Sequence, residues 1–400
     1  MMTPQTVLLS PIDAWFFRDG RPYNEGEGNQ TDVVSQFPPP ATTLVGALRA
    51  GLARERNWDG RSNWATIPEL AKVLGRDFDD LGSLRFHGPW FVRTEDGASE
   101  LLFHMPLHVL GRIKTNDASN EPRWQPQCLL TPGKQPTHCD LGSVSLPVTS
   151  AIRAKDFASQ GLKEPAAQWV TQPGLDLIHR GNLPMAEHVI DARELWRHEP
   201  RVGLKRSEDS RTTEQGALYS PRFVRLKPGV SLAMSVSGLP NDWSIPDLMP
   251  LGGEGRLADC RSSADLRIPD FLNRHARDFG MTKQIAVTLL TPLLPDDADH
   301  ERGTVAMPAP NQQFFECSGT KVISACVGKP QSLGGWDSIK REPLPLRPVL
   351  PAGSTWFLEV SDPTAFAERA GSGFGLKSQY GFGQVALGVW PLSDDSGETT

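Results

Sequence analysis

Positive charge is concentrated between residues 201 and 227 of this chain, in the stretch RVGLKRSEDSRTTEQGALYSPRFVRLK. The stretch holds seven lysines and arginines against three acidic residues, although the whole chain has a formal net charge of −6. Guanidinium and ammonium groups bind phosphate oxygens, so a local cluster suits a nucleic-acid backbone even in an acidic protein. A charged run is also typical of a solvated surface. Composition alone leaves both interpretations open.

A second candidate site is the glycine-rich stretch GSGFGLKSQYGFG at residues 371–383. A dinucleotide fingerprint requires a complete βαβ unit around it, and a kinase-type loop requires a catalytic half after it. Here a strand-like segment, QVALGVW, follows, and the sequence stops about ten residues later, so both nucleotide interpretations fail. Two readings remain: a tight turn without a ligand, or a loop whose backbone approaches a partner closely.

A third candidate is the polar loop WFFRDGRPYNEGEGNQTDVVSQ at residues 15–36, where Arg18 and Arg21 flank an Asp-Gly pair. Asp-Gly also fits an ordinary turn, and arginines on a solvated loop need no function.

The sequence gives little support for a metal site, a cofactor site or a catalytic nucleophile. His104 and His108 lie four residues apart, but Pro106 between them argues against a helix that would present both to one ion. The chain has no CxxC and no G-x-S-x-G elbow, and its five cysteines are scattered. We expect no metal, no cofactor and no nucleophilic catalysis.

The elements that must position these groups read as an α+β protein with antiparallel sheets. Four hundred residues predict two domains, and 35 prolines with 37 glycines predict many structured loops. We place the domain boundary near residue 200, an insertion at about 111–147, a projecting hairpin at about 201–227 and a disordered tail at 393–400. The amino terminus does not resemble a signal peptide and no apolar run could span a bilayer, so we expect a cytoplasmic protein without a membrane partner.

The individual elements follow from hydrophobic periodicity. Leu44, Leu48 and Leu52 recur on one face of a helix ending near residue 56, with Thr42 or Thr43 as its N-cap and with glycines and alanines that allow close approach to a sheet. Further helices are expected at 185–197, 268–279 and 363–370. Strands are expected at 5–12, 83–92, 100–110, 217–226, 230–237, 283–293, 320–327 and 384–390, with a strand pair or bent strand at 346–360.

Five stretches in register resemble one family. They are FFRDGRPYNEGEG with FPPPATTLVGALRA, RVGLKRSEDSRTTEQGALYS, LGGEGRLADC, GGWDSIKREPLPLRPVLPAGSTWFLE and the glycine-rich end. Together they run from about residue 5 to 390 and are similar to the subunit numbered three of the Cmr complex, a RAMP-superfamily protein of type III-B CRISPR effectors. The stretch 111–147 matches least well.

The resemblance implies two ferredoxin-like domains related to the RNA-recognition motif, at 1–200 and 201–392, and no catalytic role. It also implies a function in antiviral defence: holding the 5′ tag of the guide RNA and contacting the large polymerase-like subunit and the first backbone subunit. No small-molecule substrate is expected. A tag held as single strand needs cations for its phosphates and flat or donor groups for its bases. The residues expected to bind RNA are Arg18, Arg21, Arg49, Arg201, Lys205, Arg206, Arg211, Arg222, Gly375, Lys377, Ser378, Tyr380 and Gly381.

Two alternatives remain. A guide-processing, metal-independent endoribonuclease of the same superfamily would need a general base near the 2′-hydroxyl, and His87 is the only histidine in the first hundred residues. A scaffold that touches only protein would explain apolar surface residues such as Trp336 in GGWDS.

Overall fold

The computed structural model describes the greater part of the chain. The described residues are 4–18, 32–115, 121–139, 142–149, 160–206, 213–264, 266, 282–296, 308–315, 317–337 and 342–390, and for 32–34, 203–206 and 213–219 the description covers the backbone only.

The chain divides into two compact units, each assembled from separated stretches. The first unit contains residues 1–99, 193–267 and 332–347, and the second contains 100–192, 268–331 and 348–400. The boundary expected near residue 200 falls inside the first unit, where it would separate two strands that pair with the same partner strand. The units therefore alternate along the chain and do not correspond to its two halves.

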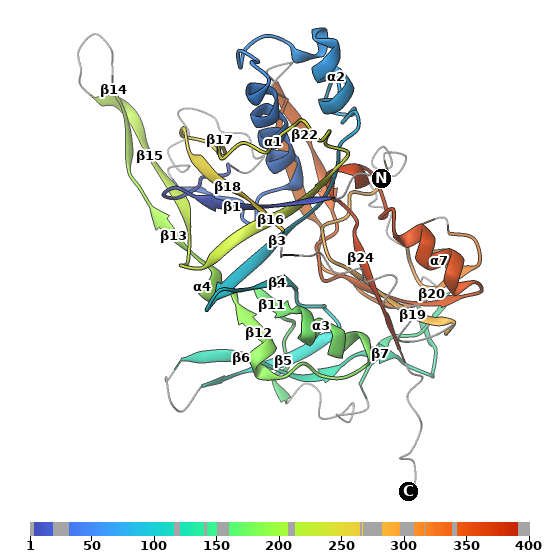
Figure 1. Ribbon diagram of the computed structural model, residues 1–400. Coiled ribbons are helices and arrows are strands. Elements are labelled where there is room, and N and C mark those ends of the chain that lie inside the picture. The colour runs from blue at the N-terminus through green and yellow to red at the C-terminus, as the bar shows by residue number, and fades with distance from the viewer. Residues whose placement is uncertain are drawn as a thin grey trace, which may run out of the picture. The chain divides into compact units, whose positions relative to one another are not determined.

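The first unit is built on an antiparallel sheet in the order β3-β16-β1-β18-β17 (Figure 1). The bounds are β1 Gln5–Pro11, β3 Arg85–Glu95, β16 Val230–Ser237, β17 Leu248–Pro250 and β18 Leu257–Ser263. If β1, β3, β16 and β18 are numbered one to four along the chain, their order across the sheet is 2-3-1-4. The sheet brings the amino terminus into the middle of strands that come more than two hundred residues later.

The helix expected up to residue 56 is confirmed as α1, Ala41–Glu55, which packs on this sheet beside β17 (Figure 1). Leu44, Leu48 and Leu52 are fully buried on one face. A Cβ atom at Gly51 would lie 2.8 Å from the Pro246 Cγ, so the helix approaches the sheet closely because this residue is glycine. The N-cap prediction was wrong: the N-cap is Pro40, which has no capping side chain.

The second unit contains two antiparallel sheets. One has the order β12-β11-β4 and the other has the order β20-β23-β19-β24. Their bounds are β4 Ala98–His104, β11 Gln168–Thr171, β12 Val189–Asp191, β19 Gln284–Leu289, β20 Thr320–Cys326, β23 Thr355–Val360 and β24 Val385–Val389. Numbered along the chain, the second of these sheets again has the order 2-3-1-4.

The core of the second unit lies on the β20-β23-β19-β24 sheet. Trp356, Phe314 and Phe374 are fully buried there, and Phe314 makes edge-to-face contacts with both other rings. Helix α7, Pro363–Ala370, confirms the prediction at 363–370 and contributes Phe366 to this core. Its N-cap is Asp362, whose carboxylate accepts hydrogen bonds from two backbone N–H groups of the first turn.

The stretch expected as an insertion, 111–147, is largely made of short strand pairs of the second unit. They are the hairpin of β5 Val109–Thr115 with β6 Pro122–Leu129, the pair β7 Thr131–Pro132 with β10 Pro147–Val148, and the hairpin of β8 Thr137–Cys139 with β9 Gly142–Val144.

The α+β class with antiparallel sheets is confirmed, but the helix expected at 185–197 is wrong. That stretch forms a 3-10 turn at Ala186–His188, then β12, then the four-residue helix α4, Ala192–Leu195, and then a strand. The helices α2, Pro68–Leu74, and α3, Gln172–His179, were not predicted. The helix expected at 268–279 lies outside the described residues.

Within the described parts of the chain, no helix is long and apolar enough to cross a membrane. The same described residues contain no group of three or more His, Cys, Asp or Glu side chains that could hold a metal ion.

Candidate nucleic-acid interface

The basic stretch forms a long two-stranded ribbon in the first unit. One edge consists of β13, Trp196–Pro200, followed by β14, Gly203–Arg206, and both pair antiparallel with the fourteen-residue strand β15, Thr213–Leu226. At about 3.3 Å per residue, β15 is about 45 Å long. Figure 1 shows β14 and the outer part of β15 extending away from β1, β17 and β18. The expected hairpin is present, and its paired strands begin at Trp196.

The base of the ribbon is attached to the motif that contains Trp15 and Phe16. Trp15 and Val224 exchange backbone hydrogen bonds of 2.9 and 2.7 Å, and the Phe16 and Phe223 rings lie 5.4 Å apart. On the outer edge of β15, the short strand β2, Asp32–Val34, pairs in parallel with Ser220–Arg222. Backbone pairing therefore holds the base of β15 on both sides, with β13 on one side and with Trp15 and β2 on the other.

The glycine-rich motif at residues 251–256 packs against the same base of the ribbon. The Gly253 N–H donates to the Phe16 carbonyl at 2.8 Å, and Gly252 has a φ of +85°. A Cβ atom at Gly252 would lie 2.7 Å from that carbonyl oxygen. Glycine is required by both the backbone conformation and the close approach, and the turn brings Arg256 to the base of the ribbon.

Five charged side chains meet at this base, and we call them the ribbon cluster. They are Asp13, Glu199, Arg201, Arg225 and Arg256. Arg201 reaches Asp13 at 2.7 Å and Glu199 at 2.6 Å, and Arg225 reaches the same two carboxylates at 2.6 and 2.5 Å. Arg256 adds a longer pair of 3.3 Å to Asp13. Three cations against two anions leave the cluster with one net positive charge.

Hydrogen bonds within the ribbon cluster hold it ionised. Side-chain hydrogen bonds from Arg225 and Arg201 lower the pKa of Glu199 to about 2, and those from Arg201 and Arg225 lower the pKa of Asp13. The same bonds raise the pKa of Arg201 and of Arg225. Asp13, Glu199, Arg201 and Arg225 therefore carry their charges throughout the physiological pH range.

An aromatic ring lies beneath the arginines. The guanidinium carbons of Arg201 and Arg256 lie 4.8 and 4.5 Å from the centroid of the Phe223 ring. Cations at this distance are attracted by the ring and lose rotational freedom. The Arg201 side chain remains 31% exposed, so it is fixed by Phe223 and still accessible to a ligand.

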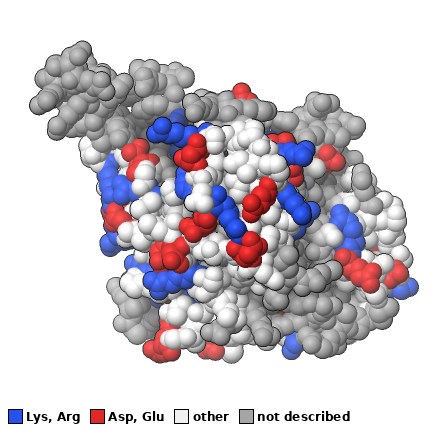
Figure 2. Space-filling model, turned by 45° about the horizontal axis from the view of Figure 1, so that its top comes forward, with Lys and Arg blue, Asp and Glu red and all other residues white. Residues whose placement is uncertain are grey.

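Such an arrangement can bind an anion. A guanidinium presents donors in a fork that matches two phosphate oxygens, and arginines fixed in advance lose less entropy when a phosphate arrives. On the face that Figure 2 shows, Lys/Arg and Asp/Glu side chains lie beside one another.

The structure describes only some of the expected RNA-binding residues. Arg18 is exposed beside the base, where its backbone bridges to Ser35, and Arg222 is exposed on β15. Since side chains alternate along a strand, Arg222 and Arg225 lie on opposite faces of the ribbon. Lys205 and Arg206 lie on β14, where only the backbone is described, and Arg21 and Arg211 lie outside the described residues.

Arg49 has a structural role. Its side chain is 5% exposed and donates to the backbone carbonyls of Leu74, Asp77 and Asp80 at 2.7 to 3.0 Å. These carbonyls lie at and beyond the carboxyl end of α2, which α1 approaches through Arg49. We therefore leave Arg49 out of the proposed interface.

The glycine-rich loop at 371–383 belongs to the second unit and is packed into it. Tyr380 is 1% exposed, and the Lys377 ammonium lies 5.2 Å from the centroid of its ring. Ser378 is half-buried in the 3-10 turn Ser378–Tyr380, and the Gly381 carbonyl accepts a hydrogen bond from the Thr291 hydroxyl at 2.7 Å. Gly375 is exposed and has a φ of +73°. Of this set, Gly375 and the partly exposed Lys377 and Ser378 are the groups that a ligand could reach.

Sequence patterns did not identify Asp13, Glu199, Phe223 or Arg256 as members of the site. Arg256 lies in LGGEGRLADC and Asp13 lies two residues before WFF, so two motifs used for the resemblance pointed to this region. No local spacing connects Asp13 with Arg201, which follows 188 residues later.

The fold and the site together define an α+β protein with antiparallel sheets and a cationic β-ribbon. The family model described as CRISPR-associated protein (Cas_Cmr3) matches residues 7–390. The chain therefore belongs to the Cas_Cmr3 family, whose members are subunits of the type III-B CRISPR effector called the Cmr complex.

The solved structures that resemble this chain come from type III CRISPR complexes. A chain of the type III-B Cmr-beta complex bound to cognate target RNA has 15% identity and a TM-score of 0.43, with 88% of this chain and 86% of that chain covered. A second structure of that complex, with target RNA and AMPPnP, gives 16% identity and a TM-score of 0.42 over the same shares. A chain of the type III-A Csm3–Csm4 subcomplex gives 12% and 0.34, covering 89% and 94%. The comparison with curated proteins found no match.

Proposed function

We propose that this chain is a non-catalytic RNA-binding subunit that holds the 5′ tag of the guide RNA with its β-ribbon. The observation that carries the proposal is the ribbon cluster: three arginines ordered by two carboxylates and the Phe223 ring, with one positive charge in excess. Lys205, Arg206 and Arg211 continue the positive charge along the ribbon in sequence.

The number of phosphates that the ribbon contacts determines how steeply RNA binding should depend on salt. Contacts with four or five phosphates of a single strand give a salt slope of about −3 to −3.5, because each contact contributes about −0.7. The net charge of −6 limits binding to other RNA, since the rest of the surface does not attract phosphate as the ribbon does. We expect weak RNA binding by the isolated chain and firm binding in the assembled complex, where neighbouring subunits pack on the ribbon.

Two further parts of the proposal concern fold and partners. In the first unit α1 follows strand one, and in the second α7 precedes strand four; both sheets have the strand order 2-3-1-4. These features support two domains related to the ferredoxin-like β-α-β-β-α-β unit.

Membership in the Cas_Cmr3 family supports contacts with the large polymerase-like subunit and the first backbone subunit, which this chain would bridge.

Charge reversal in the assembled complex tests the proposal. The triple variant Arg201→Glu, Lys205→Glu and Arg206→Glu should lower guide occupancy and abolish crosslinks between labelled tag nucleotides and residues 201–227. Arg261→Glu is the matched control, because Arg261 is exposed on the same unit and pairs only locally with Asp259. Unchanged guide occupancy and unchanged crosslinks in the triple variant would refute the proposal.

A protein-only scaffold is the second candidate, supported by Trp336, which is 60% exposed on the hairpin of β21, Gln331–Asp337, and β22, Glu342–Val349. It predicts that the tag crosslinks only to other subunits.

The endoribonuclease alternative requires His87, which lies on β3 opposite Ser235. It predicts a discrete cut in repeat RNA by the purified chain that disappears in His87→Ala.

A further inference from the structure

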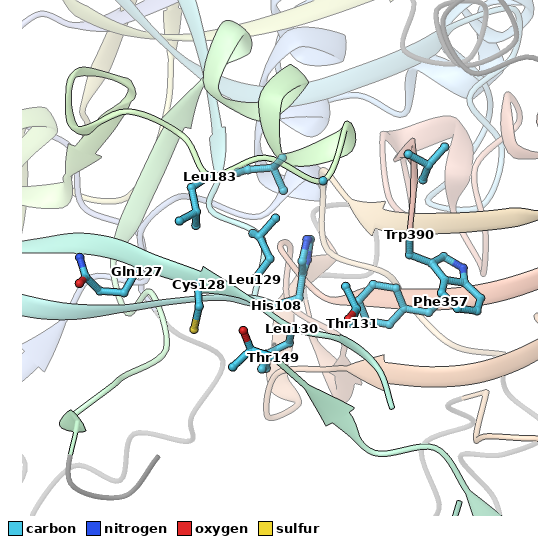
Figure 3. A pocket seen from close by; sticks show the side chains of 13 residues that line it. His108, Gln127, Cys128, Leu129, Leu130, Thr131, Thr149, Leu183, Phe357 and Trp390 are labelled. Carbon is cyan, nitrogen blue, oxygen red and sulfur yellow. The ribbon is translucent and has the colours of Figure 1, made fainter. Parts of the chain in front are cut away.

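A cavity of about 250 Å³ lies within the second unit (Figure 3). It lies between the β5–β6 hairpin, the segment after α3 and the strands β23 and β24. The thirteen residues that line it are His108, Gln127, Cys128, Leu129, Leu130, Thr131, Thr149, Ile178, Gly181, Leu183, Phe357, Val389 and Trp390. Pockets for drug-sized ligands are usually about 300 Å³ or larger, so this cavity suits one ring system.

The lining contains no Asp, Glu, Lys or Arg among the described residues. Its polar groups are one imidazole, two threonine hydroxyls, one amide and one thiol, and aliphatic and aromatic side chains fill the rest. An ion entering such a cavity would lose hydration without meeting an opposite charge. The lining therefore favours a neutral ligand with apolar faces and polar edges.

His108 is the most constrained polar group of the lining. It is 4% exposed, and its Nδ1 lies 3.1 Å from the Thr355 hydroxyl. That hydroxyl donates to the Gly353 carbonyl at 3.2 Å and also lies 3.1 Å from the Thr288 hydroxyl. Since a hydroxyl has one proton and two lone pairs, a Thr355 hydroxyl that donates to Gly353 accepts from His108 Nδ1–H and from Thr288, and we assign the protons in this way.

This bonding determines the tautomer of His108. With the proton on Nδ1, Nε2 has a lone pair and no hydrogen-bond partner among the described residues. Burial lowers the pKa of His108 to about 4, so the ring is neutral at physiological pH. Nε2 is thus a fixed hydrogen-bond acceptor in a ring that lines the cavity (Figure 3).

The aromatic wall of the cavity is also fixed. The His108 and Phe357 rings meet edge to face at 5.6 Å, and Phe357 meets Trp390 edge to face at 6.3 Å. The Trp390 indole N–H donates to the Leu358 carbonyl at 3.1 Å. A flat ligand would enter a preformed site that needs little rearrangement.

We propose that this cavity binds an uncharged nucleobase that carries an exocyclic amino group, such as adenine, with the amino group donating to His108 Nε2. The Thr131 hydroxyl can donate to an acceptor on the ring edge. Two sources can supply such a base: an unstacked nucleotide of an RNA strand, or a free nucleoside. The inference does not depend on how the ribbon binds the tag.

Ligand-observed NMR or calorimetry with adenosine and the full-length chain tests this site. Adenosine should bind at least about fivefold more tightly than N6,N6-dimethyladenosine or purine riboside, because each lacks the amino donor for His108 and one hydrogen bond contributes about that factor. His108→Phe should remove this preference. Leu183→Trp should block binding of all three by filling the mouth of the cavity, where Leu183 is 39% exposed.

The Leu183→Trp variant keeps the test valid if the His108→Phe variant fails to fold. Met185→Trp is the control for Leu183→Trp, since Met185 is also exposed but does not line the cavity. Loss of adenosine binding in the guide-loaded complex would indicate an RNA base as the source, and retention would indicate a free nucleoside. Absence of binding, equal binding of the three nucleosides, or adenosine binding that survives Leu183→Trp would overturn the proposal. The last result would mean that adenosine binds outside the cavity.

Discussion

The ribbon cluster and the cavity both bring together polar groups from distant parts of the chain, but these groups differ in charge and in exposure to solvent. At the ribbon, five ionised side chains remain partly exposed and compensate one another, leaving one positive charge. In the cavity, the polar groups are neutral, and His108 is fixed by a single hydroxyl. Exposed paired charges give attraction that salt screens, whereas buried neutral groups select a ligand by hydrogen-bond pattern. The protein separates attraction and selection between two regions.

The two regions also differ in their response to acid. The pKa of His108 in the native state is about 4, below its ordinary value of 6.5. Between pH 6.5 and pH 4 the unfolded chain therefore binds a proton at this histidine that the native state does not bind. The stability from this histidine is complete above pH 6.5 and is lost as the pH falls toward 4. The pKa of Glu199 is lowered to about 2, so its contribution is complete above its ordinary value and is lost only below pH 4.5. Mild acid should therefore weaken the cavity region before the ribbon cluster.

The largest expected effect comes from the apolar platform under the charges. Phe223→Ala should lower the free energy of unfolding by about 3 kcal/mol, because Phe223 is 2% exposed and packs against Phe16 and Ala14. Denaturant unfolding of the full chain measures it. Phe223→Leu keeps most of the buried area and should cost less than about 1.5 kcal/mol. If the two variants were equally stable, the ribbon base would be held by its charges and the contrast with the cavity would be weaker.

The next effect concerns the cavity and pH. The free energy of unfolding should fall by about 2 kcal/mol through His108 alone between about pH 7.5 and about pH 5. His108→Gln keeps a donor for Thr355 without a proton to gain, and should remove most of this contribution. His138→Gln, at an exposed position on β8, is the control. A dependence of similar size should persist in His108→Gln, because burial lowers the pKa of His104 to about 4 as well; a dependence that is unchanged from the parent chain would place the acid sensitivity elsewhere.

The smallest effects test the balance of the ribbon cluster. Asp13→Asn removes a negative charge and should strengthen RNA binding up to about fivefold at low salt, whereas Arg225→Gln should weaken it by a similar factor. Both differences should shrink as salt is added. Titrations of tag RNA at several salt concentrations measure them. If both variants weakened binding equally, the cluster would serve only to hold the ribbon together.

Much of the fold follows from local sequence. The leucine spacing at 44, 48 and 52 predicts α1, and the polar stretch between two strand-like runs predicts the ribbon. The helix expected at 185–197 failed because Val189–Asp191 pairs with β11 and Trp196–Pro200 pairs with β15, so tertiary pairing overrides helical propensity. The division into units was missed for a similar reason, since β1 lies between β16 and β18.

The candidate site was only partly predictable. Charge density identified the ribbon and Arg201, but Asp13 and Arg256 join through contacts across 188 and 243 residues. Arg49 looked like an RNA ligand because its charge is visible in sequence while its three carbonyl acceptors are not. The cavity could not be foreseen, because nothing local in the sequence indicates that His108 meets Thr355.

The fourteen residues of β15 form both the anchored and the free portion of the ribbon, and this limits how the length can vary between relatives. Pairs of residues added or removed at the far tip would change its reach by about 7 Å per pair and leave the anchored end as it is. One residue inserted between Trp196 and Glu199 would turn every later side chain of that strand to the opposite side, so that Glu199 would face away from Arg225 and Arg201 would face away from Asp13. Size variation is thus tolerated at one end and forbidden at the other.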